Sequence, residues 1–285
     1  MGNVDKAGGI EFVKSVIKWC MSEERYDIAD RIGINASYYC YARGDGSILT
    51  DSIEMFRYKC AEVLEDSEEM SNALAAQLNI SSKRGRIEDA ALVIELLRKL
   101  NYKPDRVYSE VRLLHAWGQY YLATEQYDKA YEIWHSLYLR RNNLRPMDVG
   151  TVSRWLCECM RRMKKSDEEI LTILKGSLVS SKEHNATRDI LQCSIQIAEI
   201  QISSGKITNK EVRDFLQLER NVNDVGDPSF RAQYYFLKYQ VDMLRNEPEL
   251  ARESLMLSKE NYDTIFNAKM SQKIDSLLSS INNGS

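Results

Sequence analysis

The chain has 285 residues and a formal net charge of −3, and a charge this small singles out no class of partner. Hydrophobic residues make up 44% and charged residues 28%, which is ordinary for a soluble globular protein. Only 13 Gly and 4 Pro punctuate the chain, fewer turn residues than an all-β or α/β protein of this length usually needs, so an all-α fold is predicted.

Cysteine usage and hydropathy bear on the compartment. The cysteines, at positions 20, 40, 60, 157, 159 and 193, form no C-x-x-C pair, and no signal peptide precedes them, so we expect reduced thiols in a cytoplasmic protein. The apolar stretch 12–21 is too short and too charged to span a membrane. Cys157 and Cys159 would point to different faces of a helix, so we expect small buried hydrophobic residues there and no metal site.

Residues 1–66 are predicted to form four short helices, at about 10–21, 25–32, 35–42 and 51–64, with Thr50 or Asp51 capping the last. Residues 25–44, RYDIADRIGINASYYCYARG, resemble a helix-turn-helix, in which Ala29 is the small residue at the helix crossing and Gly33 the turn residue with positive φ. The resemblance implies DNA contacts from Arg31, Asn35, Ala36, Ser37, Tyr38, Tyr41 and Arg43.

The alternative for this segment is a helical cap on the rest of the chain, without DNA contact. Residues 1–66 hold 8 basic and 12 acidic residues, which repel phosphate, although 31–44 contain no acid. The local chain pattern favours the DNA-binding interpretation, and the total charge favours the cap.

Residues 114–137, LHAWGQYYLATEQYDKAYEIWHSL, carry two apolar stripes at helical spacing around a short polar turn. The small residues Gly118 and Ala130 let two antiparallel helices approach, while Tyr121, Tyr127 and Trp134 fill the space around that contact. This segment closely resembles a tetratricopeptide repeat.

The turn-then-small-residue pattern recurs. Its apolar position falls at residues 90, 130, 170, 212 and 251, so about five units of roughly 40 residues cover 67–266. A last helix at about 261–281 would cap the stack. The prediction is a right-handed α-solenoid of tetratricopeptide-like helix pairs over 67–285, after a separate domain over 1–66.

Two alternatives to this solenoid were weighed. One is an irregular helical bundle with chance similarity to the repeat. The other is an RNA binder of the pentatricopeptide type, suggested by the Lys-Pro-Asp that ends at residue 105. Such a binder needs a basic surface, but residues 67–285 hold 31 basic and 30 acidic residues.

No P-loop, G-x-G-x-x-G, H-E-x-x-H or G-x-S-x-G motif occurs, so we expect no enzyme activity and no cofactor. A helix-turn-helix followed by about five repeats is similar in layout to the peptide-pheromone-responsive regulators of Gram-positive bacteria and their phages. That resemblance implies a homodimeric transcription regulator whose repeats hold a peptide or protein segment in a groove. The competing class is an adaptor or scaffold without DNA contact.

Side-chain amides and charges on the first helix of each repeat are the groove candidates, since such groups bond a peptide backbone. They are Asn72, Asn79, Arg112, His115, Gln119, Arg162, Gln233 and Gln240.

Overall fold

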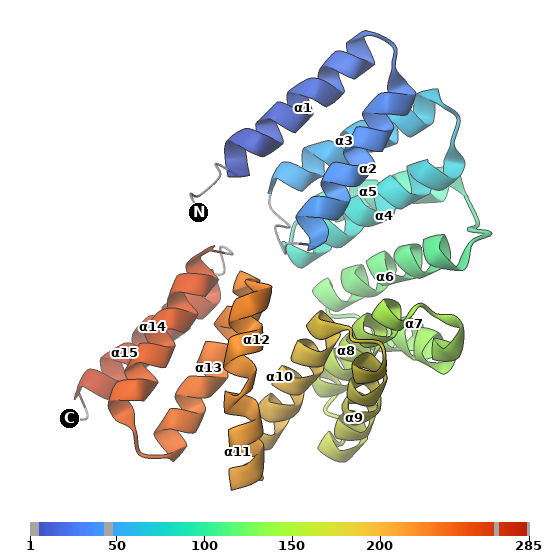
Figure 1. Ribbon diagram of the computed structural model, residues 1–285. Coiled ribbons are helices and arrows are strands. Elements are labelled where there is room, and N and C mark those ends of the chain that lie inside the picture. The colour runs from blue at the N-terminus through green and yellow to red at the C-terminus, as the bar shows by residue number, and fades with distance from the viewer. Residues whose placement is uncertain (1–5, 43–47, 265–267, 284–285) are drawn as a thin grey trace. The chain divides into compact units, whose positions relative to one another are not determined.

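The computed structural model describes residues 6–42, 48–264 and 268–283, and Figure 1 shows the chain as a succession of helices. Every regular element in these ranges is helical, which confirms the predicted all-α class. The chain divides into two compact units, Met1–Leu144 and Arg145–Ser285, called here the first and the second unit.

The first unit contains α1 (Lys6–Ser22), α2 (Tyr26–Ala42), α3 (Ile48–Val63), α4 (Ser67–Lys83), α5 (Ile87–Leu100), α6 (Val107–Ala123), α7 (Tyr127–Leu139) and a 3₁₀ turn (Arg141–Asn143). The second unit contains α8 (Pro146–Arg162), α9 (Asp167–Glu183), α10 (Thr187–Ser203), α11 (Asn209–Leu216), α12 (Leu218–Val225), α13 (Pro228–Leu244), α14 (Pro248–Thr264) and α15 (Ala268–Asn283).

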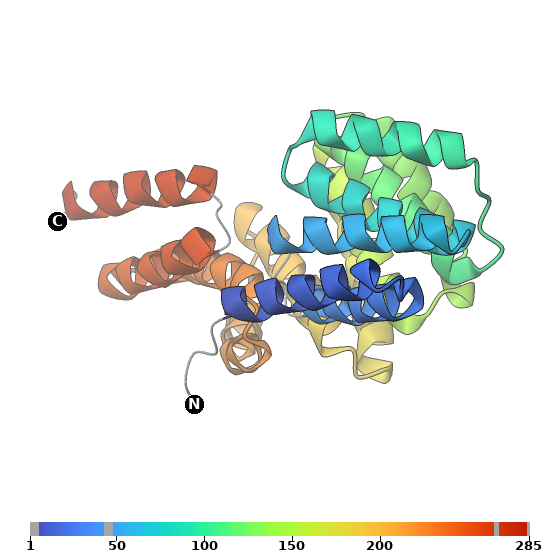
Figure 2. The same cartoon turned by 90° about the horizontal axis from the view of Figure 1, so that it is seen from above.

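Helices α1, α2 and α3 pack around a small core that includes Ile17, Cys20, Ala29 and Cys60, and Figure 2 shows α1 lying alongside α2. The predicted turn at Gly33 is wrong, because α2 runs unbroken through that residue. Gly33 has no positive φ. It is needed for close packing instead, since a Cβ there would lie 2.7 Å from Cγ of Arg57 on α3.

Arg57 ties α2, α3 and α4 together although its side chain is only 3% exposed. Its guanidinium lies 2.7 Å from a carboxylate oxygen of Glu54 and 2.8 Å from one of Glu69, while its Nε lies 3.9 Å from Asp30. Burial opposes the charged form, but the three carboxylates outweigh it and raise the pKa of Arg57. We call these four residues the Arg57 cluster.

The Arg57 cluster crosses the predicted domain boundary between residues 66 and 67. Glu69 belongs to α4, which packs against α3 within the first unit. Residues 1–66 therefore do not form a compact unit of their own, and whether function divides at residue 66 stays a prediction.

Replacing Asp30 by Asn is expected to stabilise the protein at neutral pH. Burial, opposed by Arg57 and reinforced by Glu69, raises the pKa of Asp30 from 3.8 to about 6. Stability contributed by this carboxyl is therefore fully present below pH 4 and is lost as the pH rises through about 6. Asp30→Asn should gain about 1 kcal/mol at pH 7.5, since solvent screens part of the effect, and almost nothing at pH 4.

Urea denaturation of both proteins between pH 4 and 8 measures that difference. Asp27→Asn on the same helix is the matched control, because the Asp27 side chain is 62% exposed and should matter by less than about 0.5 kcal/mol. A difference for Asp30→Asn that does not change between pH 4 and pH 8 would contradict the prediction.

The repeat pattern is visible in the first unit as the pairs α4–α5 and α6–α7. Each connection turns through one residue of positive φ, Gly85 in the first pair and Glu125 in the second. Ala90 and Ala130 lie in the first turns of α5 and α7 and are fully buried, as the spacing predicted. Gly118 of α6 meets Trp134 of α7 so closely that a Cβ would lie 2.5 Å from the indole.

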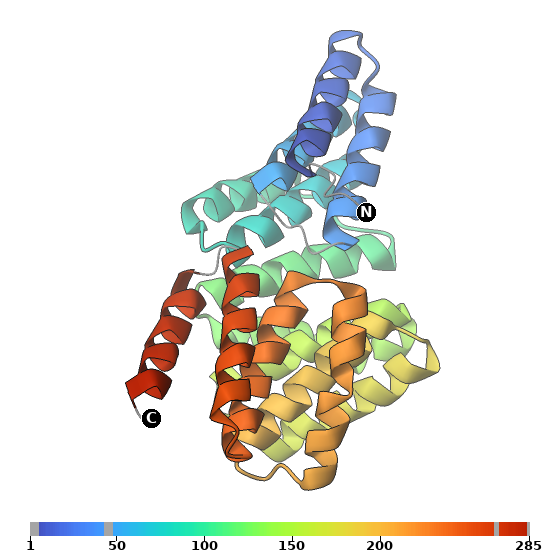
Figure 3. The ribbon, with the colours of Figure 1, turned by 60° about the vertical axis from the view of Figure 1, so that its left-hand side comes forward.

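In the second unit the pairs are α8–α9 and α13–α14, and Figure 3 shows α13 and α14 side by side with α15 next to them. Ile170 and Ala251 are fully buried in the first turns of α9 and α14, again as predicted. The unit around Val212 differs, because its second helix breaks at Gln217 into α11 and α12.

The predicted capping helix at 261–281 is wrong at its start. Helix α14 continues to Thr264, and α15 begins at Ala268. The fully buried Ile274 anchors α15 in a core cluster with Leu255 and Tyr262 of α14.

Candidate functional site

Two pairs of polar side chains lie at equivalent positions on the adjacent helices α4 and α6. Asn72 and Asn79 are seven residues apart on α4, and Arg112 and Gln119 are seven apart on α6. Seven residues make nearly two helical turns, so each pair shares a face. Because α4 packs against α6, we call these four residues the polar face of the first unit.

The amides of Asn79 and Gln119 are buried, with 6% and 3% of their surfaces exposed. Within the described chain, Oδ1 of Asn79 and Nε2 of Gln119 have no hydrogen-bond partner. Leaving such a buried group unsatisfied costs about 1–3 kcal/mol, so native proteins rarely do so without a function. The two groups are an acceptor and a donor, which is the complement of a peptide group.

Asn72 and Arg112 are oriented by neighbours on their own helices. Asn72 donates to Oε1 of Glu69 at 3.2 Å, and the other oxygen of Glu69 accepts from Arg57. Arg112 donates to the hydroxyl of Tyr108 at 3.1 Å and lies 5.6 Å from the centre of that ring. Both side chains are thus positioned before any ligand arrives.

His115 packs against the helix pair. Its ring meets the indole of Trp134 edge-on, with 4.9 Å between the ring centres. It is therefore held at the contact between α6 and α7, beside the polar face.

The remaining predicted groove residues belong to the second unit. Arg162 on α8 is 58% exposed and bonds Glu158 at 2.8 Å. Gln233 and Gln240 are half-buried on α13, seven residues apart and thus on one face of that helix.

Sequence reasoning missed Gln192 and Glu199 on α10. Arg154 of α8 donates to Gln192 at 3.2 Å, and Arg161 of α8 makes a bidentate pair with Glu199 at 2.8 and 2.9 Å. A signal was present, because the two residues follow Arg112 and Gln119 by two whole periods of 40 residues.

The residues predicted to contact DNA do not form the expected recognition helix. Arg31 and Asn35 are exposed, and Asn35 donates to the carbonyl of Arg31. Ser37 donates to Glu54 and so faces α3, and Ala36 is half-buried. The side chains of Tyr38 and Tyr41 and all of Arg43 lie outside the described residues.

The described cysteines are buried thiols without disulfides. Burial raises the pKa of Cys159 to about 12 and that of Cys193 to about 11, so both thiols are neutral and unreactive near pH 7. Within the described ranges, no group of three or more His, Cys, Asp or Glu side chains could hold a metal ion. None of the helices described is long and apolar enough to cross a bilayer.

Helix pairs recurring every 40 residues, with polar side chains at equivalent positions, define an all-α protein of the tetratricopeptide-like type. Among solved structures, the chain is similar to a Rap protein complexed with competence and sporulation factor. The two share 12% identity, the match covers 99% of this chain and 88% of that one, and the TM-score is 0.61. No protein-family model and no curated protein matches the sequence.

Proposed function

We propose that this chain is a binding protein, not an enzyme, and that the polar face of the first unit holds a peptide or an extended protein segment. The observation that carries the proposal is the pair of buried amides, Asn79 and Gln119, whose free acceptor and donor lie on neighbouring helices.

The spacing of the polar face suits an extended chain. Residues seven apart on a helix are separated by about 10 Å along its axis. Three residues of an extended peptide cover about the same length. An Asn or Gln side chain offers both a donor and an acceptor, so it can bond both groups of one peptide unit. Arg112 adds a positive charge that favours a carboxylate on the ligand.

The structural comparison supports a ligand-binding role. The similar Rap protein was solved in complex with competence and sporulation factor, and its likeness covers nearly all of this chain. By analogy of fold, this chain would also hold a signalling molecule on its helix pairs.

Removing the polar groups while keeping their volume should abolish binding without unfolding the protein. The variant combines Asn79→Leu, Arg112→Met and Gln119→Met. Three lost hydrogen bonds of about 1 kcal/mol each predict at least a 100-fold weaker Kd. The thermal midpoint should stay constant or rise, since the buried amides are unsatisfied.

A randomised heptapeptide library, selected on the wild-type protein, supplies the probe for calorimetric titration. The matched control is Asn221→Leu, Arg220→Met and Gln217→Met, the same residue types on the exposed surface of α12. The proposal fails if the control weakens binding as much as the variant, or if the variant binds the selected heptapeptide as wild type does.

DNA binding by residues 1–66 stays a sequence-based prediction and is not part of this proposal. It rested on a turn at Gly33, where α2 is continuous. An adaptor that holds a protein segment, without any DNA contact, is equally served by the polar face.

A further inference from the structure

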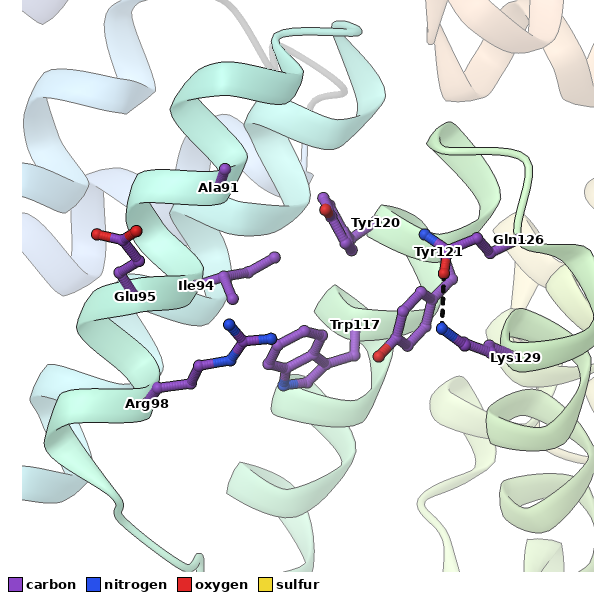
Figure 4. A pocket seen from close by; sticks show the side chains of 9 residues that line it. All are labelled: Ala91, Ile94, Glu95, Arg98, Trp117, Tyr120, Tyr121, Gln126 and Lys129. Carbon is purple, nitrogen blue, oxygen red and sulfur yellow. Dashed lines mark hydrogen bonds between the residues drawn. The ribbon is translucent and has the colours of Figure 1, made fainter.

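A second cavity of about 260 Å³ lies between α5 on one side and α6 and α7 on the other. Helix α4 packs closely against both α5 and α6, whereas α5 touches α6 at few positions. The connection from Asn101 to Arg106 contains Pro104 and is longer than the other turns of the first unit. The loose packing of α5 on α6 leaves the space that we call the aromatic cleft, shown in Figure 4.

Three aromatic rings from α6 line the cleft. Trp117 stacks on Tyr121 with 5.8 Å between ring centres and 29° between planes. Tyr120 meets Trp117 edge-on at 6.3 Å and Tyr121 at 5.7 Å. All three are half-buried, so parts of their surfaces remain open to an incoming group.

A cation stands on each side of these rings. Arg98 extends from α5 toward Trp117, and Lys129 comes from α7 on the opposite wall (Figure 4). Lys129 donates to Gln126 at 2.8 Å and lies 5.4 Å from the centre of the Tyr121 ring. Among the described residues, neither cation has a carboxylate within ion-pair distance, although Glu95 also lines the cleft.

We propose that the aromatic cleft binds a partner segment consisting of one aromatic side chain flanked by acidic residues. An aromatic ring finds ring faces and edges on Trp117 and Tyr120, and its flanking carboxylates find Arg98 and Lys129. The volume is below that of a drug-sized pocket and suits a single side chain.

The cleft is distinct from the polar face. Trp117 and Tyr120 lie on the side of α6 that packs toward α5, whereas Arg112 and Gln119 lie about a quarter turn or more away on the helix surface. Both sites can be occupied together, so this inference does not depend on the proposed function.

The probe is the peptide acetyl-Asp-Glu-Phe-Glu-Asp-amide, titrated into the full chain labelled with ¹⁵N at tryptophan. The indole N–H resonance of Trp117, identified with Trp117→Phe, should shift on titration, and that of the distant, exposed Trp19 should not. Arg98→Glu combined with Lys129→Glu should weaken the apparent Kd at least tenfold. Both residues are exposed, so the fold should be kept, which circular dichroism checks.

Controls separate the cleft from general charge attraction. Lys99→Glu with Lys210→Glu makes the same change of charge at exposed positions outside the cleft and should leave binding intact. A peptide with Ala in place of Phe should not shift the Trp117 resonance.

Three results would overturn the proposal. The first is no shift of Trp117 at millimolar peptide, and the second is an equal shift with the alanine peptide. The third is a Trp117 resonance that depends on protein concentration without peptide, which would mean that a second copy of this chain fills the cleft.

Discussion

Replacing Arg57 by methionine is expected to lower the free energy of unfolding by about 3–5 kcal/mol. Arg57 is the one cation among Glu54, Glu69 and Asp30, and Glu54 is 1% exposed. Methionine fills a similar volume but leaves those carboxylates buried without a counter-charge, and uncompensated buried charge is among the costliest defects known.

Urea denaturation at pH 7.5 measures this loss. Arg25→Met is the matched control, because Arg25 is 59% exposed and its contact with Asp27 spans 3.9 Å, so a change within about 0.5 kcal/mol is expected. Arg57→Lys should lose part of the same stability, since a point charge cannot bridge several carboxylates as a planar guanidinium does. Equal stability of Arg57→Met and wild type would refute the bridging role.

Trp134→Ala is expected to cost about 3–5 kcal/mol. Trp134 is fully buried at the contact of α7 with α6, where its indole lies over Gly118 and meets the ring of His115. Truncation removes a large buried surface and leaves a cavity that two packed helices cannot close. Trp19→Ala is the control, since Trp19 is 63% exposed and should matter by about 0.5 kcal/mol or less.

Gly118→Ala tests the same contact from the other helix. The added Cβ would lie 2.5 Å from the indole, so about 1–3 kcal/mol should be lost through overpacking. Gly176→Ala on α9 has nothing within 4 Å of the new Cβ and should gain about 0.5–1 kcal/mol from helix propensity. Thermal melts that rank the two variants in the opposite order would contradict this account of the contact.

The repeat was predictable because close approach of two helices requires a small or well-fitted residue at a fixed place. Ala90, Ala130, Ile170 and Ala251 all meet that requirement and are all fully buried. At Val212 the same spacing was correct, but the helix breaks five residues later, at Gln217. The broad pattern repeats through the chain, and the local break is particular to one unit.

Gly33 shows why the first 66 residues were harder to predict. A glycine among helical residues suits either a turn or a close contact, and local sequence cannot separate the two. What decides is Arg57, which lies 24 residues later and packs across Gly33. The aromatic cleft was invisible for a similar reason, because it depends on how loosely α5 packs on α6.

The candidate site was half predictable. Asn79, Arg112 and Gln119 were found from helix position, and the structure places them on adjacent helices. Gln192 and Glu199 were missed because they were not compared with residues two periods earlier. Their ion pairs and hydrogen bonds with α8 depend on packing that only the structure shows.

The division at Leu144 has a consequence for how this protein unfolds. Each unit has its own core, so equilibrium denaturation is expected to show two cooperative transitions in place of one. Asp30, Arg57, Gly118 and Trp134 all belong to the first unit, so substitutions there should move one transition and leave the other in place. The stability of this chain is therefore a pair of free energies, and each substitution reports on one of them.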